Sequence, residues 1–319
     1  DQDLIIVRST VSIGSSRGIV QTALDRAGKK TMLAMCPERT IEGKALQELT
    51  GLPQIVGGRD KESTIAACDF FSYHGIQTVK VTSLEAAEVT KLINNSYRDL
   101  QFAFGNEIAT LCDRLGVSAR EVITAANKDY ERSNIALPGL TAGPCLEKDP
   151  WILYNAGTQV GVEMQITRSA REVNEGTVIN GIGHLKQKFP ELTPNRILIA
   201  GLAFKGRPET SDTRGSLAFD VINKCSEFFP SADIFTFDPL VRTSDLDYSL
   251  AEGHLSELSS EIEPFDLLVI QHNGESMLSK LRTYRSLIEN AKVLDFWDSG
   301  IHSAIASEDN YFSFGGRGV

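Results

Sequence analysis

A cysteine follows a loop rich in glycine and proline in residues 137–150, LPGLTAGPCLEKDP. Lys148 and Asp149 stand three and four residues after this Cys145. A nearby cation lowers the pKa of a thiol from about 8.5 and so favours the nucleophilic thiolate. If a helix begins at Cys145, Asp149 lies one turn away on the same face. A nucleophile, a cation and a carboxylate at this spacing predict covalent chemistry.

The same residues also have a plainer interpretation. A lone cysteine is more often a small buried hydrophobe, and Lys-Asp-Pro is a common turn sequence. Whether Cys145 is a nucleophile or a buried cysteine beside a turn depends on the elements that would position it.

Residues 1–58 alternate between strand-like and helical runs. The strand-like runs are 3–10, 31–36 and 54–58, and the helical ones are 16–27 and 43–50. This alternation predicts a parallel α/β sheet, in which ligands gather at the carboxyl ends of the strands. Thr10 follows the first strand, and Glu38 and Glu42 follow the second. Ordinary loop and helix-cap chemistry is the alternative explanation for these residues.

A strand-like run at 78–81 leads to a strongly periodic helix that extends to about residue 115. Thr82 and Glu85 have the spacing of a capping box at its start. Lys91 and Asn95 are four residues apart and therefore share a face. Such a pair is usually solvated, but apolar neighbours make a partly buried role possible here. Further helical runs at 118–126 and 151–189 make the middle third of the chain helical.

A second α/β unit begins near residue 195. Its strands are expected at 196–205, 232–238, 265–270 and 291–296, with a helix at 217–228. The glycine pattern is atypical for a nucleotide-binding unit. Lys205, Arg207 and Arg214 stand close to the expected helix amino end, where a phosphate or pyrophosphate is favoured. A structural α/β domain with a solvated basic loop is the alternative.

Length and composition limit the class of protein. The 319 residues allow two or three domains, and the net charge of −10 argues against a nucleic-acid partner. No apolar run approaches the roughly 18 residues of a membrane span, and no basic-then-apolar leader is present. The five cysteines are scattered and match neither a disulfide framework nor a metal site, so we expect a cytoplasmic protein without a bound metal.

Seven motifs, in order, resemble the UDP-glucose/GDP-mannose (nucleotide-sugar 6-) dehydrogenase family. They are Arg-Ser-Thr-Val at 8–11, Pro-Glu-Arg at 37–39, Lys-Leu-Ile-Asn-Asn at 91–95, Asn-Glu at 106–107, Gly-Pro-Cys-Leu-Glu-Lys-Asp at 143–149, Gly-Leu-Ala-Phe-Lys at 201–205 and Asp-Thr-Arg at 212–214. The resemblance covers nearly the whole chain. It implies two Rossmann-like parallel-sheet domains joined by a long central helical region. Residues 1–81 would be the last part of an NAD-binding domain, 82–190 a central dimerisation region with the cysteine loop, and 191–319 a UDP-binding domain.

The resemblance also implies a four-electron, NAD-dependent oxidation of a sugar C6 alcohol to a carboxylate. Cys145 would trap the C6 aldehyde as a thiohemiacetal, and a second oxidation would leave a thioester for water to cleave. Lys91 and Asn95 would hydrogen-bond the oxygen that carries negative charge. Asp149, with Lys91 or a water, would remove the proton.

Further roles follow from the same resemblance. Glu38 would handle the hydrolytic water, and Thr10 would position a water or the cofactor. Residues expected to face NAD are Thr10, Glu42, Lys148 and Arg214. Residues expected to face a UDP-sugar are Glu38, Lys91, Asn95, Arg132, Gly139 and Lys205, with Arg132 resembling an arginine that reaches the partner subunit's site. A homodimer through the central helix is expected.

The motifs do not agree on one substrate. Residues 37–39 and 43–58 look more like the UDP-N-acetylmannosamine branch, whereas the Cys-x-x-Lys-Asp pattern is closer to UDP-glucose enzymes. The chain also departs from the family pattern. It has Ala142-Gly143 where most members have paired glycines, and it has no clear counterpart of a late arginine near residues 296–299, for which Arg317 is a weak substitute.

The sequence has no initiator methionine and no Gly-x-Gly-x-x-Gly motif. We therefore expect that about 100 residues of a Rossmann half are missing at the front, and that the chain as given binds NAD poorly. Two other hypotheses stay open at this point. One is a truncated, non-catalytic nucleotide-sugar-binding dimer. The other is a two-electron dehydrogenase of the hydroxyacid type, which needs no thiol.

Overall fold

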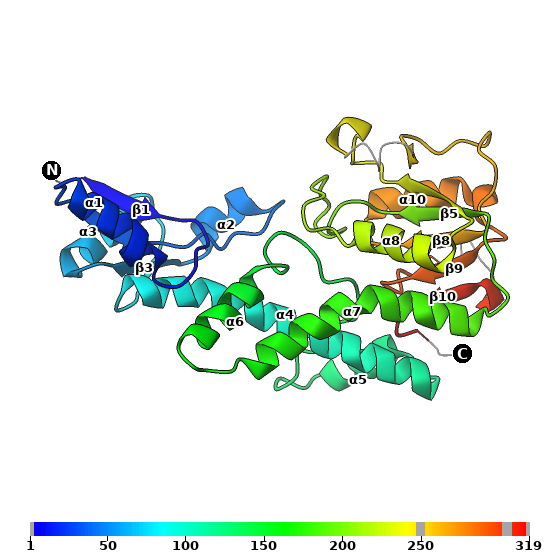
Figure 1. Ribbon diagram of the computed structural model, residues 1–319, viewed down its shortest axis with the longest axis horizontal. Helices are drawn as coiled ribbons and strands as arrows, with labels where there is room; N and C mark the ends of the chain where they lie inside the picture. The colour runs from blue at the N-terminus through cyan, green and yellow to red at the C-terminus, as the bar shows by residue number, and fades with distance from the viewer. Residues whose placement is uncertain (1–2, 247–252, 302–307, 317–319) are drawn as a thin grey trace. The chain divides into compact units, whose positions relative to one another are not determined.

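The computed structural model describes residues 3–246, 253–301 and 308–316 (Figure 1). It forms two compact units: residues 1–98 with 148–168, and residues 99–147 with 169–319. Each unit is described by itself. The long helices α4 (Leu84–Leu115) and α7 (Gln165–Lys188) contribute residues to both. The division into residues 1–81, 82–190 and 191–319 stays a prediction.

The first unit contains a sheet in the order β1-β2-β3-β4. Its strands are β1 (Leu4–Val7), β2 (Met32–Met35), β3 (Gln54–Gly58) and β4 (Thr78–Lys80). β1 with β2, and β3 with β4, are parallel, but β2 and β3 are antiparallel. The expectation of a purely parallel sheet is therefore wrong at this pair. The connection through α2 (Ala45–Gly51) returns to the edge it left, so β3 starts where β1 and β2 end.

Helices cover both faces of this sheet, because successive strand residues point to opposite sides. Leu33 and Met35 pack with Leu84 at the start of α4. Ala34 packs on the other face with Phe71 of α3 (Lys61–Tyr73). The predicted helices did not include α3. The predicted helix at 16–27 consists of η1 (Ser16–Gln21), which is a π-helix, and α1 (Thr22–Arg26).

The helix starts differ in detail from those expected. Ser83, and not Thr82, caps α4, since its hydroxyl accepts the backbone N–H of Ala86 at 3.1 Å. Helix α5 (Ala119–Asn127) begins as predicted, with the Ser118 hydroxyl as its cap. Helix α6 (Asp149–Gln159) begins at Asp149, followed by a proline that suits a first helical turn. Cys145 lies in the turn before this helix, so the condition under which Asp149 would share a helix face with it is not met.

The second unit contains a six-stranded, entirely parallel sheet in the order β10-β9-β8-β5-β6-β7. Its strands are β5 (Arg196–Ala200), β6 (Asp233–Phe237), β7 (His254–Leu255), β8 (Leu267–Ile270), β9 (Lys292–Asp295) and β10 (Tyr311–Ser313). This is the Rossmann strand order, so the predicted fold class is confirmed. Strands β7 and β10 were not expected. The order reverses between β5 and β8, and in this fold ligands bind beside the carboxyl ends of those two strands.

Side chains alternate across this sheet in the same way. Ile197 and Ile199 pack against α8 (Ala218–Phe228) and α7. Leu198 and Ala200 face α10 (Glu275–Thr283) on the opposite side. Figure 1 shows α8 and α10 beside these strands. Within the described ranges, no helix combines the length and apolar character needed to cross a membrane.

Candidate active site

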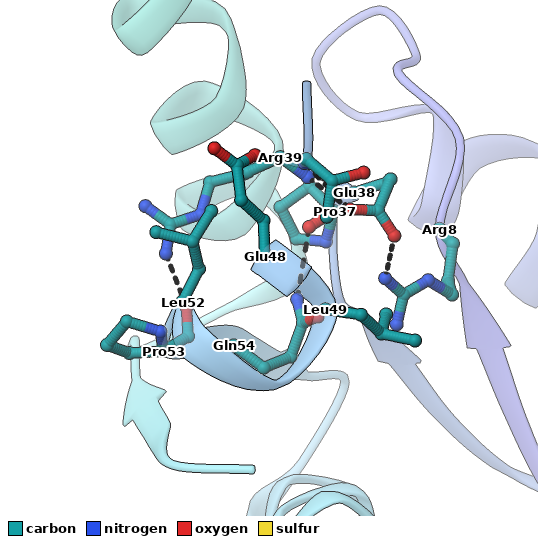
Figure 2. Close-up of a pocket in the computed structure, with 10 residues that line it drawn as sticks. Arg8, Pro37, Glu38, Arg39, Glu48, Leu49, Leu52, Pro53 and Gln54 are labelled. Atoms are coloured by element: carbon teal, nitrogen blue, oxygen red, sulfur yellow. Dashed lines mark hydrogen bonds and ion pairs between the residues drawn. The ribbon is translucent and has the colours of Figure 1, made fainter. Parts of the chain in front are cut away.

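The carboxyl ends of β1 and β2 meet at a small pocket in the first unit (Figure 2). The guanidinium of Arg8 pairs with the carboxylate of Glu38. The same carboxylate accepts the backbone N–H groups of Arg39 and Thr40, both at 2.8 Å. Burial alone would raise the pKa of Glu38, but the Thr40 N–H and Arg8 outweigh burial, and the pKa is lowered. Glu38 is therefore an ionised hydrogen-bond acceptor at neutral pH.

The start of β3 completes this pocket. The amide of Gln54 donates to the carbonyl of Pro37 at 3.0 Å, and the guanidinium of Arg39 donates to the carbonyl of Pro53 (Figure 2). A purely parallel sheet would place only the residues after strand carboxyl ends at this edge. Gln54 is the first residue of β3, so it was not predicted to lie here. The antiparallel direction of β3 brings its first residue to the same edge.

Two predicted cofactor residues lie near this edge. Thr10 is half-buried after β1, and its hydroxyl has no hydrogen bond to any other residue that the structure describes. Glu42 is exposed in the turn before α2.

A glutamate that the sequence analysis did not consider holds the loop after β1. Glu88, on α4 and only 1% exposed, accepts the backbone N–H groups of Gly14 at 2.5 Å and Ser16 at 2.8 Å. Its carboxylate therefore satisfies donors at the start of η1 and fixes the loop that contains Thr10. The only sequence signal was an acidic residue one helical turn from both Leu84 and Leu92.

Three of the predicted catalytic residues come together between α4 and α6. Lys91 and Asn95 are both buried, at 7% and 6% exposed, as the apolar neighbours had indicated. The Asn95 amide donates to the carboxylate of Asp149 at 2.6 Å, and Lys148 forms an ion pair with the same carboxylate at 2.5 Å. The ammonium of Lys91 makes no ion pair or hydrogen bond with another described residue.

The second unit contains the cysteine loop. Cys145 is exposed, whereas the other four cysteines are buried. Gly143, at φ +103°, donates its N–H to the carbonyl of Gly215 at 2.8 Å. A Cβ at position 143 would lie 2.5 Å from the ring of Phe204, so only glycine fits. Of the two positions where most family members have glycines, the close approach falls on Gly143, which is glycine here as well. Position 142 holds alanine.

Gly139 is enclosed from two sides. Its N–H donates to the side-chain oxygen of Asn106 at 2.9 Å, and an added Cβ would lie 2.7 Å from the indole of Trp297. The indole N–H donates in turn to the carbonyl of Gln271 at 2.7 Å. Trp297 thus occupies the segment in which a late arginine was sought. Arg317 lies outside the described residues.

The basic residues of the second unit have partners nearby. Arg214 is exposed and binds Asp212 through Nε at 3.0 Å and Nη2 at 2.6 Å, so a phosphate at this arginine would compete with a carboxylate. The ammonium of Lys205 lies 5.0 Å from the ring of Phe204. Arg132 is stacked over Tyr130 at 4.7 Å.

Asp238, at the end of β6, stands where many Rossmann domains bind a ribose. Here its Oδ2 accepts the N–H groups of Leu202 at 2.9 Å and Ala203 at 3.1 Å, and His272 lies 2.9 Å away. Burial would raise the pKa of Asp238, but His272 and these N–H groups outweigh burial, and the pKa is lowered. The carboxylate is fully engaged in shaping the loop after β5. In the described ranges, no group of three His, Cys, Asp or Glu side chains could hold a metal ion.

Three profiles of one family match the chain in order. They are described as the NAD binding domain (residues 1–73), the central domain (85–176) and the UDP binding domain (198–299) of the UDP-glucose/GDP-mannose dehydrogenase family. A UDP-N-acetyl-D-mannosamine dehydrogenase of Methanococcus maripaludis is 33% identical over 75% of this chain, which spans 54% of that relative. An NDP-N-acetyl-D-galactosaminuronic acid dehydrogenase of Ralstonia solanacearum is 27% identical over 91% of this chain, which spans 66% of it.

A solved structure of UDP-D-ManNAc dehydrogenase from Pyrococcus horikoshii is similar in fold. It superposes with a TM-score of 0.82 at 26% identity and covers 98% of this chain and 72% of its own. The chain thus spans between about half and two thirds of the curated relatives described above.

Proposed function

Because this chain belongs to the UDP-glucose/GDP-mannose dehydrogenase family, we propose that it acts in the NAD-dependent oxidation of a nucleotide-sugar C6 alcohol to the uronic acid. The observation that carries the proposal is Lys91, a buried cation without a partner among the described residues, one turn before Asn95. Its ammonium has no carboxylate beside it among the described residues, so a bound oxygen that carries negative charge would be favoured at this place. The alkoxide and the tetrahedral species of this oxidation supply such an oxygen.

Each residue has a distinct role in the proposed reaction. Asp149, held by Asn95 and Lys148, takes the proton of the C6 hydroxyl directly or through a water. Lys91 and Asn95 stabilise the oxyanion. The Cys145 thiol adds to the aldehyde to give a thiohemiacetal, and the second oxidation gives a thioester. Water then cleaves the thioester, which releases the carboxylate and restores the thiol.

Glu38 is suited to hold the hydrolytic water, since it is ionised and fixed by Arg8. NAD, when bound, accepts the hydride in both oxidations. The hydroxyl of Thr10, which has no partner among the described residues, and the exposed carboxylate of Glu42 fit a role as polar contacts of the cofactor.

UDP-N-acetyl-D-mannosamine or a related UDP-hexosamine is the favoured substrate, and UDP-glucose comes next. The support is the similarity to relatives named for N-acetylated sugars, together with the Pro37-Glu38-Arg39 segment. The carboxyl ends of β5 and β8 offer a place for the nucleotide, beside the loop that Asp238 shapes.

Replacing Cys145 with serine tests the mechanism. We expect acid formation from UDP-N-acetylmannosamine to be lost, while calorimetry shows unchanged UDP-sugar binding. Unchanged acid formation would exclude the covalent step. Binding without turnover in the unaltered chain, at saturating NAD, would instead support a non-catalytic nucleotide-sugar-binding protein.

A homodimer through the central helix is the proposed assembly. On the second unit's part of α4, Phe104, Leu111 and Leu115 are 46%, 52% and 65% exposed, and they are spaced seven and four residues apart. This spacing forms one apolar stripe, as in helices that pack against another helix. Leu111→Glu should give monomers in sedimentation velocity, whereas Lys280→Ala, at an exposed position of α10, should leave the dimer intact. A cytoplasmic location stays a prediction.

A further inference from the structure

A chain of hydrogen bonds joins α7 to the loop that carries the proposed nucleophile. Arg171 lies 2.6 Å from Asp99 Oδ1, and the Asn174 amide donates to the same oxygen at 2.9 Å. The Asn106 amide donates to Asn174 Oδ1 at 2.9 Å, and the N–H of Gly139 donates to Asn106 Oδ1 at 2.9 Å. All of these residues belong to the second unit.

The four side chains of this hydrogen-bonded chain, here called the relay, are buried. Asp99 and Asn174 are 0% exposed, Asn106 1% and Arg171 2%. Replacing buried ion pairs by apolar residues is often neutral or stabilising, so stability alone does not account for the relay. Such a relay fixes the orientation of its side-chain amides. Asn106 must turn its amide nitrogen towards Asn174, and this leaves its oxygen facing Gly139.

We propose that Asn106 and Asn174 are positioning residues for Cys145, acting through the backbone at Gly139. The inference rests on the proposed role of Cys145 as nucleophile. The loop is then fixed at two points, at Gly139 by Asn106 and at Gly143 by Gly215, and the cysteine follows two residues after the second point. On its other side, Gly139 is closed off by Trp297.

Hydrogen exchange and thiol kinetics on the full chain test this. In Asn106→Ala, the Gly139 amide should exchange about tenfold faster, as expected for the loss of one buried hydrogen bond. The reaction of Cys145 with Ellman's reagent should become several-fold faster, because a released loop presents its thiol in more orientations. The other four cysteines are buried and should react slowly in native protein. Glu107→Ala, at the exposed neighbouring position, should change neither rate.

Asn174→Ala provides a second test one step away, since it leaves the Asn106 oxygen in place as the acceptor. We expect a smaller change in the same direction, and none in Asn180→Ala on the exposed side of α7. Gly139 exchange in Asn106→Ala that equals that of Glu107→Ala would overturn the inference. So would an unchanged Cys145 rate in both relay variants, with circular dichroism showing them folded.

These measurements need no turnover, so they separate the inference from the proposed function. Acid formation that survives in Cys145→Ser would refute the catalytic role of the thiol and thereby the basis of the inference, while the exchange rates would stay the same. If Cys145 does carry out the chemistry, Asn106→Ala should lower kcat by a larger factor than it raises the KM for the UDP-sugar, which Gly139 is expected to face. Equal losses in both constants would overturn the positioning role.

Discussion

Gly143 offers a sharp test of how the cysteine loop is held. Its φ of +103° disfavours any side chain, and an added Cβ would lie 2.5 and 2.7 Å from two carbons of the Phe204 ring. The backbone conformation alone costs an L-residue about 1–2 kcal/mol. Forcing a methyl group into packed surroundings costs about 1–3 kcal/mol more. We therefore expect Gly143→Ala to lower the free energy of unfolding of the second unit by about 2–5 kcal/mol.

Gly116 is the matched control. It also has a positive φ, +69°, in the second unit, but a Cβ there would meet no heavy atom of the described residues within 4 Å. Gly116→Ala should therefore show only the backbone cost, about 1–2 kcal/mol. The difference between the two variants isolates the contact with Phe204. It should be about 1–3 kcal/mol.

Urea denaturation in a Trp151→Phe background measures this difference. The chain has two tryptophans, and with Trp151 replaced the fluorescence comes from Trp297 in the second unit. If Gly143→Ala and Gly116→Ala lose equal stability, the loop does not pack on Phe204 as described. The argument that the loop is fixed at this glycine would then be wrong.

Three further predictions concern charged groups. Arg8→Gln should raise the pKa of Glu38, because the Thr40 N–H stays but the guanidinium that lowers the pKa together with it is gone; a carbon-detected NMR titration of the carboxyl would show this. Asp238→Asn should cost about 3 kcal/mol at neutral pH. Because the folded pKa of Asp238 is lowered, this difference should shrink as the pH falls below about 4, which urea titrations at several pH values would reveal. Arg120→Ala removes contacts of 2.7 and 2.8 Å to Asp298 and to the carbonyl of Trp297, and should cost about 1–2 kcal/mol and shift the Trp297 emission.

Local patterns predicted much of the fold. The alternation of strand-like and helical runs identified β1 to β4 and most strands of the second sheet, and the helical run predicted at 118–126 located the start of α5. The direction of β3 was not predictable in this way, because a connection of the same length can either cross over a sheet or return along its edge. Likewise, the spacing of Thr82 and Glu85 predicted the wrong cap, because the hydroxyl that caps α4 belongs to the next residue, Ser83, and only the helix geometry shows this.

The site shows the same limit more clearly. The family motifs singled out Lys91, Asn95 and Asp149. The structure places these three in one unit, with Asn95 hydrogen-bonded to Asp149. The motifs did not indicate Glu88, whose partner Gly14 lies 74 residues away in the sequence. Nor did they indicate the hydrogen bond between Asn106 and Gly139, which are 33 residues apart. Contacts over such separations depend on tertiary packing, and a single sequence carries no local signal for them.

The pairing of Gly143 with Gly215 affects how relatives could be recombined. A Cβ added at Gly215 would lie 3.0 Å from the backbone of Gly143 and 2.5 Å from the Glu147 carboxylate, so the two loops touch backbone to backbone. A chimera that exchanges residues 191–319 alone would take these two surfaces from different parents. The cysteine loop and the 213–216 turn should therefore be taken from the same parent, although about 70 residues of sequence separate them.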